Sequence, residues 1–413
     1  LDKLKILAES AKYDVSCASS GTSRGHKAGA IGSAAGWGIC HSFAEDGRCI
    51  SLLKIMLTNY CRYDCAYCIN RRSNDIPRAT LSVTELVNLT IEFYRRNYIE
   101  GLFLSSGVVR NPDYTMERLV RIVKDLRTIH RFNGYIHLKG IPGASPELIH
   151  EAGLYADRMS VNIEIPNEKS LQTLAPEKDF QSVFTPMRHI QQGVLESAEE
   201  RKKYRSAPRF APAGQSTQMI IGATPDSDKD ILRLSSALYQ RPTMKRVYYS
   251  GFVPVNAYDN RLPQLKQPPL VRENRLYQAD WLLRFYQFKV DEIVDDSYPD
   301  LDLEIDPKLA WALRHPEKFP VDINRADYEL LLRIPGLGVK SAKMIIVSRR
   351  YGKINGSQLK KMGVVLKKAQ YFITCNELPL QTVQELRPER VRQLLIPHKG
   401  KQEDPRQLKI IFE

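Results

Sequence analysis

Three cysteines stand close together in the stretch TNYCRYDCAYCINRR (residues 58–72), at Cys61, Cys65 and Cys68. The chain has 7 cysteines in 413 residues, and this odd number argues against a secreted disulfide framework and favours metal or redox use. Thiolates are the ligands that iron–sulfur clusters require, and three thiolates leave one iron of a four-iron cluster open to another ligand. A structural zinc site needs a fourth Cys or His nearby, and the nearest downstream histidine is His130. The three thiols therefore indicate metal or redox use, and they lack the nearby fourth ligand of a structural zinc site.

The elements around these cysteines alternate between short apolar runs and amphipathic stretches. We expect strands at residues 51–57, 101–106, 134–139, 158–165, 216–223 and 246–253, and helices at 82–97, 111–132 and 226–240. Such a β/α series forms a parallel sheet, as a doubly wound sheet or as an incomplete barrel. In both, ligands bind beyond the C-terminal ends of the strands. The cysteines follow the first expected strand directly, so they lie at that end.

The spacing Cys61-x3-Cys65-x2-Cys68 after a strand resembles the cluster loop of the radical S-adenosylmethionine (SAM) superfamily. This resemblance implies an α/β fold with an incomplete (β/α)6 barrel, a [4Fe–4S] cluster on the three cysteines, and SAM as the second cofactor. It also implies reductive cleavage of SAM to a 5′-deoxyadenosyl radical, with an electron donor such as flavodoxin or ferredoxin. Tyr67, just before the last cysteine, matches a position that packs near the adenine of SAM.

Further residues are assigned to SAM by the same resemblance. Ser105, Ser106 and Gly107 lie where the superfamily has a Gly-Gly-Glu-type segment that binds the methionine amine, although the glutamate is absent here. Gly222 in MIIGATPD and Tyr249 in VYYSGF match segments that approach the adenosine.

Two more candidates come from the third and fourth expected strands. Lys139, which ends HLKG, is a candidate partner of the SAM carboxylate, and an ordinary surface lysine is the alternative. In RMSVNIEIP the strand alternation puts Ser160, Asn162 and Glu164 on one face. Polar groups on an inward face need partners. The ribose hydroxyls of SAM suit them, and an internal hydrogen-bonded network is the alternative.

The positive charge is concentrated near the C-terminus. Of the net charge of +14, residues 307–413 contribute +11, from 21 Lys and Arg against 10 Asp and Glu, and residues 1–306 contribute +3. The preceding stretch VDEIVDDSYPDLDLEID (residues 290–306) has eight acids and no base, which we interpret as a solvated linker. We therefore expect an N-terminal extension (1–50), a partial barrel (51–255), a linker containing a helix (256–306) and a basic domain (307–413).

The basic segment FPVDINRADYELLLRIPGLGVKSAKMIIVSRRYGKI (residues 319–354) resembles a helix-hairpin-helix, an all-α module that grips the DNA backbone without reading sequence. A turn through Gly336 and Gly338 leads into a helix whose first backbone N–H groups, near Lys340 and Ser341, can hold a phosphate, with Lys343 adding charge. A second, degenerate copy in SQLKKMGVVLKKAQYFI would complete a paired unit that spans the minor groove. A purely structural hairpin is the alternative.

The two halves together resemble radical SAM proteins described as DNA modification or repair proteins. The resemblance implies a radical enzyme that acts on DNA, held by sequence-independent backbone contacts. Three alternatives stay open: an enzyme acting on RNA or a nucleoprotein, one acting on a peptide or small molecule, and a DNA-binding sensor with a structural cluster. The bond changed, the fate of SAM and the oligomeric state are not indicated.

The N-terminal region has a predicted helix and three further cysteines. LDKLKILAESAKYD (residues 1–14) has the spacing of an amphipathic helix and lacks the apolar core of a signal peptide. With no apolar run of about 18 residues, we expect no membrane span and a cytoplasmic location. Cys17, Cys40 and Cys49 are candidates for a second cluster, and inert core cysteines are the alternative.

Overall fold

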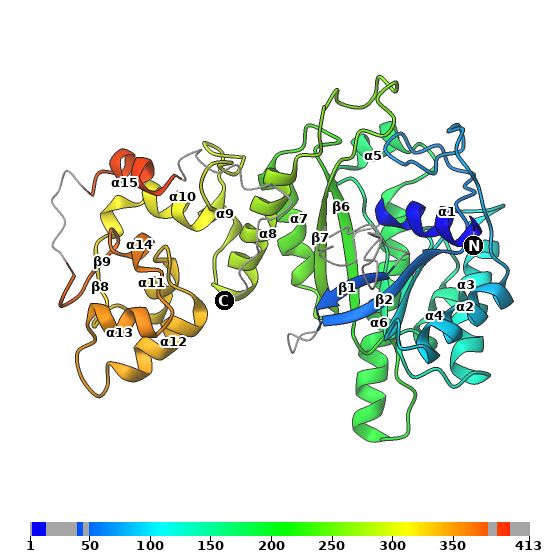
Figure 1. The fold of residues 1–413 in the computed structure, drawn as a ribbon, viewed down its shortest axis with the longest axis horizontal. Coiled ribbons are helices and arrows are strands. Elements are labelled where there is room, and N and C mark those ends of the chain that lie inside the picture. Colours follow the sequence, from blue (N-terminus) through cyan, green and yellow to red (C-terminus); the bar gives the residue numbers. More distant parts are fainter. Residues whose placement is uncertain (1, 14–38, 44–48, 379–385, 397–413) are drawn as a thin grey trace, which may run out of the picture. The chain divides into compact units, whose positions relative to one another are not determined.

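The structure, a computed structural model, describes residues 2–13, 39–43, 49–378 and 386–396 (Figure 1). It divides into two compact units. The first, here called the barrel unit, comprises Leu1–Asp226 and Ala237–Pro269, and the second, the C-terminal unit, comprises Ser227–Ser236 and Leu270–Glu413. The expected linker at 256–306 is therefore divided between the two units and does not form a separate segment.

The barrel unit is built on a sheet in which the described strands follow one another in chain order, β1-β2-β3-β4-β5-β6-β7. Six of them are parallel: β2 (Cys49–Met56), β3 (Gly101–Ser105), β4 (Tyr135–Lys139), β5 (Arg158–Ser160), β6 (Gln215–Ile221) and β7 (Met244–Gly251). A doubly wound sheet would reverse its strand order at a switch point. The unbroken order therefore confirms the incomplete (β/α)6 barrel.

One strand was not expected from the sequence. β1 (Ile39–Phe43) pairs antiparallel with β2, in a register that opposes Ile39 to Leu53 and Phe43 to Cys49. The N-terminal extension thus contributes an edge strand to the barrel sheet. It also contains α1 (Asp2–Ser10), which confirms the expected amphipathic helix, and the short 3-10 helix η1 (Ala11–Tyr13).

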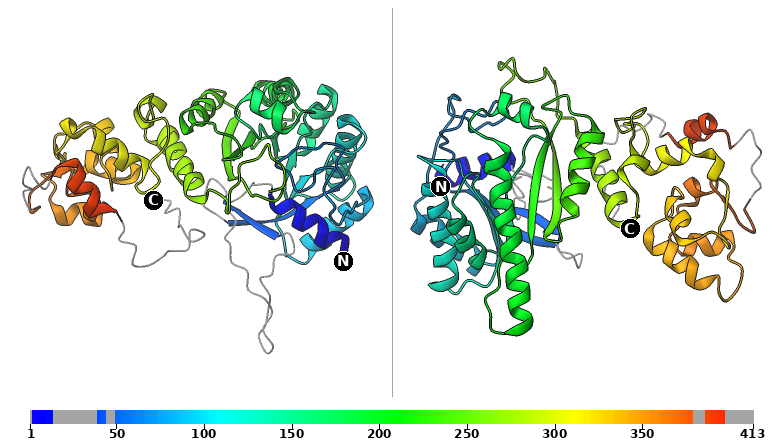
Figure 2. Two further views of the ribbon diagram at one scale, coloured as in Figure 1. Left: turned by 90° about the horizontal axis from the view of Figure 1, so that it is seen from above. Right: turned by 180° about the vertical axis from the view of Figure 1, so that it is seen from behind.

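Helices connect the parallel strands. They are α2 (Val83–Arg95), α3 (Pro112–Thr128), α4 (Pro146–Tyr155), α5 (Glu168–Leu174), α6 (Phe180–Lys203) and α7 (Asp228–Tyr239), the last shared between the two units. α2 begins at a capping box in which Ser82 accepts from the N–H of Glu85, and α3 begins after Asn111, which accepts from the N–H of Tyr114. α2, α3, α4 and α6 lie side by side against the sheet (Figure 2).

The C-terminal unit is predominantly helical. Its elements are α8 (Leu270–Phe285), α9 (Val290–Ile293), α10 (Pro307–Arg314), η2 (Pro316–Lys318), β8 (Val321–Asp322), α11 (Tyr328–Arg333), α12 (Val339–Ser348), α13 (Gly356–Lys361), α14 (Leu366–Ala369), β9 (Ile373–Thr374) and α15 (Pro388–Leu395). β8 and β9 form a parallel two-stranded sheet. The region expected to be all-α (307–413) therefore contains, besides its helices, one small sheet with two residues in each strand.

The acidic stretch 290–306 is solvated in part, and several of its acids form ion pairs within the C-terminal unit. Glu292 pairs with Arg333 at 2.8 Å, and Asp306 pairs with Lys368 at 2.9 Å. Asp302 pairs with Arg392 at 2.5 Å. These pairs join the stretch to α11, α14 and α15 within the C-terminal unit. The acids of this stretch therefore pair with basic residues from distant positions in the sequence. The run of acids without bases at 290–306 is thus part of an internal contact of this unit.

None of the helices in the described ranges combines the length and the apolar composition that crossing a bilayer requires.

Candidate active site

The three cysteines lie in the loop that follows β2, at the C-terminal end of that strand. All three are free thiols, with Cys65 buried and Cys61 and Cys68 partly buried. Cys65 packs in an apolar cluster with Ala66 and Phe252. The loop that carries the thiols is therefore part of the barrel unit's core at its strand ends.

The segment after β3 holds this loop by direct backbone contact. The N–H of Gly107 donates to the carbonyl of Thr58 at 2.8 Å, and the N–H of Val108 points to the sulfur of Cys61 at 3.4 Å. A side chain at Gly107 would place its Cβ 2.3 Å from the carbonyl oxygen of Tyr60. Glycine is therefore required by the close approach of the cluster loop.

A buried arginine ties the cluster loop to the segment after β7. The guanidinium of Arg71 contacts Asp64 at 2.9 Å and Asp259 at 2.6 Å. Hydrogen bonds from Arg71 lower the pKa of Asp64, and hydrogen bonds from Arg261 and Arg71 lower the pKa of Asp259. Both acids are therefore charged at neutral pH, and the ion pairs persist.

Asn256 completes this attachment. Its side-chain amide donates to the carbonyl of Ala66 at 2.7 Å and to that of Cys68 at 3.0 Å. The sequence analysis missed Arg71, Asp259 and Asn256 because ordinary charged and amide residues carry no spacing signal.

The residues present fit a [4Fe–4S] cluster. Each cysteine of such a cluster binds a different iron, so the thiols surround a volume and need not converge on one point. In the part of the chain that the structure describes, no three Cys, His or acidic side chains converge on a single ion. Burial raises the pKa of Cys65, and burial with the neighbouring thiols raises that of Cys68 to about 12. Thiolates here therefore need nearby positive charge, which iron supplies.

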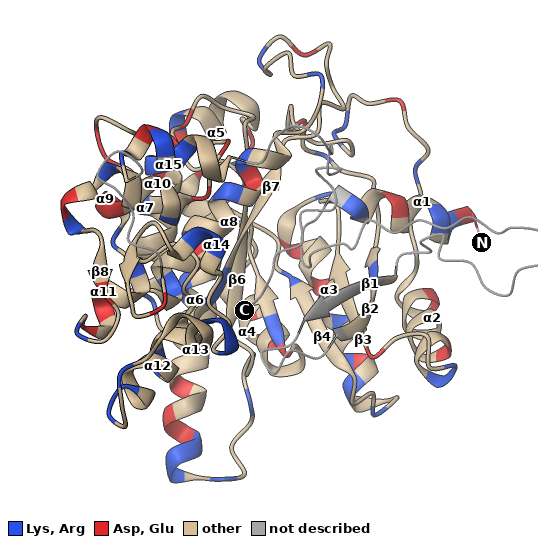
Figure 3. Ribbon diagram, turned by 60° about the vertical axis from the view of Figure 1, so that its left-hand side comes forward, with Lys and Arg blue, Asp and Glu red and all other residues tan. Residues whose placement is uncertain are grey.

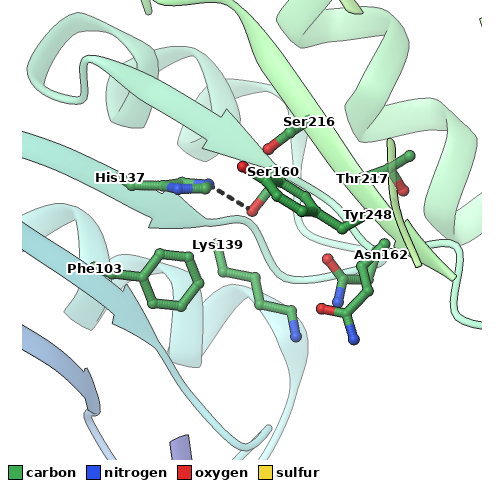
Figure 4. Close-up of a pocket in the computed structure, with 9 residues that line it drawn as sticks. Phe103, His137, Lys139, Ser160, Asn162, Ser216, Thr217 and Tyr248 are labelled. Carbon is green, nitrogen blue, oxygen red and sulfur yellow. Dashed lines mark hydrogen bonds between the residues drawn. The ribbon is translucent and has the colours of Figure 1, made fainter. Parts of the chain in front are cut away.

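Inside the barrel a small pocket is lined almost entirely by polar side chains (Figure 4). The lining residues are Phe103, His137, Lys139, Ser160, Asn162, Ser216, Thr217, Gln218 and Tyr248. His137 Nε2 and the hydroxyl of Ser160 lie 3.0 Å apart. The pocket's free volume of about 10 Å³ suits roughly one water molecule.

The structure brings several predicted SAM residues to this pocket. Ser160 and Asn162 line it together, as the strand alternation predicts, although β5 ends at Ser160. Glu164 adopts φ 65° and pairs with Lys139 at 3.9 Å. Lys139 is therefore not a plain surface lysine. That these side chains bind SAM stays a prediction.

Two other residues predicted to contact SAM, Tyr249 and Gly222, do not line this pocket. Tyr249 is fully buried, whereas its neighbour Tyr248 lines the pocket, because successive strand residues point to opposite faces. A side-chain contact from this strand into the pocket thus comes from Tyr248. Gly222 adopts φ 84°, and a Cβ there would lie 2.9 Å from the Pro269 ring, so glycine is already required within the protein.

In the segment Ser105–Gly107, the groups that could contact a ligand are mainly those of the backbone. Ser105 is buried, and its hydroxyl has no hydrogen-bond partner among the described residues. Ser106 donates to the carbonyl of Gly107 at 2.7 Å.

Lys178 is a cation beside the cluster loop that the sequence analysis missed. Its ammonium lies 3.4 Å from the hydroxyl of Tyr67 and 5.8 Å from the ring centroid. Burial lowers the pKa of Lys178, but the neighbouring acidic groups of Cys65, Tyr67 and Glu164 outweigh burial and raise it. Because it lies in an irregular loop between α5 and α6, no periodicity could have indicated it.

In the C-terminal unit, two helical hairpins pack through their turns. Between α11 and α12, Gly336 adopts φ 82°. Between α13 and α14, Gly363 adopts φ 83°. The N–H of Val365 donates to the carbonyl of Gly336 at 2.8 Å, and Ser341 donates to the carbonyl of Met362 at 2.8 Å. Each turn thus has a glycine with positive φ two residues before the N-cap of the helix that follows.

The predicted phosphate residues separate into three groups. Lys340 and Lys343 are exposed on the first turns of α12. Ser341 is buried and donates its hydroxyl to the carbonyl of Met362, so the predicted phosphate contact at this position concerns its backbone N–H. Gly338 has φ −90°, which any residue adopts, so Gly336 is the position where the turn requires glycine.

Of the second-cluster candidates, Cys17 lies outside the described residues. Cys40 and Cys49 lie on β1 and β2, where the register opposes them to Leu52 and Phe43 respectively.

Comparison with known proteins assigns the barrel. Residues 55–206 match the family model of the radical SAM superfamily. Methylornithine synthase matches at 14% identity and a TM-score of 0.41, over 56% of this chain and 61% of that chain. HydG, a maturase of the [FeFe]-hydrogenase, matches at 13% identity and a TM-score of 0.42, over 82% and 81%.

Coproporphyrinogen III oxidase (HemN) from Escherichia coli matches at 14% identity and a TM-score of 0.34, over 63% of this chain and 57% of that chain. No curated protein matches the sequence significantly. Residues 55–206, with the cysteine loop at the C-terminal end of β2, are thus a radical SAM domain, an enzyme domain whose cofactors are a [4Fe–4S] cluster and S-adenosylmethionine.

Proposed function

We propose that this radical SAM enzyme acts on DNA, modifying a nucleotide or repairing a lesion. The observation that carries the proposal is the pair of hairpins in the C-terminal unit, whose turns pack through Gly336 and Val365. Paired hairpins of this kind present two helix starts, at Val339 in α12 and Leu366 in α14. Backbone N–H groups at helix starts bind phosphate oxygens without reading base sequence.

Charge around the two turns supports a polyanionic partner. Lysines are frequent on α12, α13 and α14 (Figure 3). The exposed lysines on these helices are Lys340, Lys343, Lys360, Lys361 and Lys367. Sequence-independent binding through such groups should release counterions and weaken steeply as salt rises.

In the barrel unit, we assign the chain's residues to the cofactors as follows. Cys61, Cys65 and Cys68 hold the cluster and leave one iron for SAM. Backbone carbonyls of Ser105–Gly107 accept the methionine amine, Ser160, Asn162 and Glu164 orient the ribose, and Tyr67 packs near the adenine. Gly222 and the backbone at Tyr249 lie beside the adenosine, and Lys139 balances the charge of Glu164 and the SAM carboxylate. When bound, cluster and SAM supply the radical chemistry, and the protein supplies placement and exclusion of water.

The remaining partners follow from this chemistry. An external one-electron donor of the flavodoxin or ferredoxin type reduces the cluster. A reducing compartment such as the cytoplasm suits the free thiols of the cluster loop. A nucleotide that reacts inside a barrel must leave the duplex stack, so a flipped base is the form of substrate that we expect.

The experiment compares DNA binding by two double variants that have equal charge changes. Lys340→Glu with Lys343→Glu reverses two exposed charges on α12, and Lys318→Glu with Arg390→Glu reverses two exposed charges on η2 and α15 of the same unit. Fluorescence anisotropy at several salt concentrations should show about 10-fold or greater loss of duplex DNA affinity for the α12 variant, with a shallower salt slope. The control variant should lose much less.

Structured RNA and single-stranded DNA are measured in parallel. Equal losses in the two variants would show a diffuse charge effect and no specific site on α12. A clear preference for RNA would transfer the proposal from DNA to RNA. Cluster content should be the same in all variants, because these lysines lie outside the barrel unit.

A further inference from the structure

Exposed arginines lie beside the cluster loop of the barrel unit. Arg62 follows Cys61 and is exposed, and its guanidinium donates to the carbonyl of Arg110, which is also exposed. The guanidinium of Arg110 lies over the ring of Tyr114 at 4.5 Å, and that of Arg118 lies 6.0 Å from the same ring. We call Arg62, Arg110, Tyr114 and Arg118 the arginine patch.

The arginine patch is tied to a cluster cysteine by backbone hydrogen bonds. The N–H of Arg62 donates to the carbonyl of Val108 at 2.8 Å, and the N–H of Val108 points to the sulfur of Cys61 at 3.4 Å. Cys61 is partly exposed, whereas Cys65 is 5% exposed. The arginine patch therefore lies where a cluster ligand comes near the surface.

Several features keep the charge of the arginine patch available. Arg110 adopts φ 57°, a conformation that non-glycine residues rarely adopt, and this backbone geometry accompanies the stacking on Tyr114. Asp113, the acid next to Tyr114 in sequence, accepts the N–H of Ser145 at 2.7 Å. Stacking on a ring face leaves the N–H edge of Arg110 free to meet a carboxylate, whereas Arg118 also donates to the carbonyl of Leu81 at 2.9 Å.

We propose that the arginine patch is the docking surface for an acidic one-electron donor protein of the flavodoxin or ferredoxin type. One electron passes from the reduced donor to the cluster, so the donor is oxidised by one electron and the cluster is reduced by one. Electron-transfer complexes are small and transient, and opposite charges increase their rate of association. The proposal does not depend on DNA as the substrate, because it concerns only how the electron arrives.

The test is the rate of cluster reduction, followed by loss of the cluster's visible absorption in stopped flow without substrate turnover. The variant is Arg62→Glu with Arg110→Glu, and the reductants are a reduced acidic flavodoxin and a small photoreduced flavin. At low salt the variant should be reduced by flavodoxin about 10-fold more slowly or worse than wild type, because electrostatic steering is lost. Reduction by the small flavin should be unchanged, and added salt should bring variant and wild type together.

The matched control is Lys203→Glu with Arg205→Glu, which reverses two exposed charges at the C-terminal end of α6 in the same unit. It should be reduced by flavodoxin at nearly the wild-type rate. If Arg62→Glu disturbs the cluster loop, Arg110→Glu alone repeats the measurement, because the Arg110 side chain contacts the Tyr114 ring. Iron content checks that each variant holds a full cluster.

Three results would overturn the proposal. One is an unchanged rate with flavodoxin. Another is equal slowing with both reductants, which would assign the arginines to the cluster itself. The third is loss of DNA affinity with normal reduction by flavodoxin, which would make the arginine patch a nucleic-acid contact.

Discussion

Arg71 shows that the cluster loop depends on side chains outside the cysteine spacing. Its guanidinium is 6% exposed and lies between two carboxylates, one of which, Asp259, is 188 residues away in sequence. The cysteine spacing predicted what the loop can bind, since all three thiols lie within one short stretch of sequence. It could not predict what holds the loop, since the distant partners Asp259 and Asn256 come from the segment after β7.

We expect Arg71→Met to destabilise the apoprotein by about 3 kcal/mol, because it leaves Asp64 and Asp259 without their buried partner. Arg72→Met is the matched control, since Arg72 is exposed and should change stability by less than about 0.5 kcal/mol. Urea unfolding measures both, and iron content after reconstitution should fall only in the first. Equal effects in the two variants would show that the Arg71 ion pairs do not hold the loop.

The polar face at β5 allows a second test with single residues. Asn162→Ala and Glu164→Gln should each weaken SAM binding by roughly 1 to 3 kcal/mol, which corresponds to about 5- to 150-fold in Kd. Glutamine is used at position 164 because φ there is 65°, and a residue of the same size keeps the local packing. Calorimetric titration of the reconstituted protein with SAM measures this loss.

Gln172→Ala, an exposed change on α5, is the control and should bind SAM normally. Normal SAM binding in both the Asn162 and the Glu164 variants would make this face an internal hydrogen-bonded network.

Strands and helices could be predicted where a short stretch of sequence has a clear apolar or amphipathic pattern. The parallel strands are apolar runs because they are buried on both sides, and β3 is buried at every position. α6 gave no clear pattern, because Pro186 and Gly193 interrupt it. Gly193 is required there, since a Cβ would lie 2.6 Å from the ring of Phe210. The pairing of Glu292 with Arg333 could not be predicted, because these residues meet only in the folded unit.

The two glycines in the turn between α11 and α12 should differ in the stability that is lost when each is replaced by Ala. Gly336→Ala should destabilise the C-terminal unit by about 1 to 3 kcal/mol, since φ is 82° and a Cβ would lie 2.7 Å from the carbonyl oxygen of Val365. Gly338→Ala should cost less, because its Cβ would only touch the Tyr286 hydroxyl at 3.6 Å. Thermal unfolding and duplex DNA affinity should rank the two variants in this order. A reversed order would contradict the assignment of the strained turn to Gly336.

A buried lysine of α10 supports the same turn and gives a pH dependence. Lys308 donates to the carbonyl of Leu337 at 2.5 Å, and burial lowers its pKa to about 7. Between about 7 and the unfolded value of about 10.4, the unfolded chain holds a proton that the folded protein lacks. The free energy of unfolding should therefore rise with pH in this window, by up to about 1.4 kcal/mol per pH unit from this residue.

Urea unfolding at pH 7 to 10 of wild type and Lys308→Met isolates this contribution. The difference between the two proteins should shift in favour of wild type as pH rises. A difference that stays constant with pH would show that Lys308 has an ordinary pKa in the folded protein.

At the scale of the whole molecule, the barrel unit carries the radical chemistry and the C-terminal unit carries the features from which DNA binding is proposed. The barrel, the cluster loop and the hairpins were predictable because each has a recognisable pattern within one continuous stretch of sequence. The identity of the substrate could not be predicted in this way, since it depends on which side chains from distant segments meet at the mouth of the barrel.

The measurement that tests the account most directly is anaerobic turnover of the reconstituted, reduced enzyme with SAM and duplex DNA carrying deuterated nucleotides. We predict that 5′-deoxyadenosine forms, that deuterium from DNA appears in it or in SAM, and that both signals disappear when Cys61, Cys65 and Cys68 are replaced by Ala. Lys340→Glu with Lys343→Glu should reduce deuterium transfer while leaving DNA-free cleavage of SAM intact. Cleavage of SAM with no deuterium transfer from any labelled nucleotide, at a rate that DNA does not change, would contradict the proposal that DNA is the substrate.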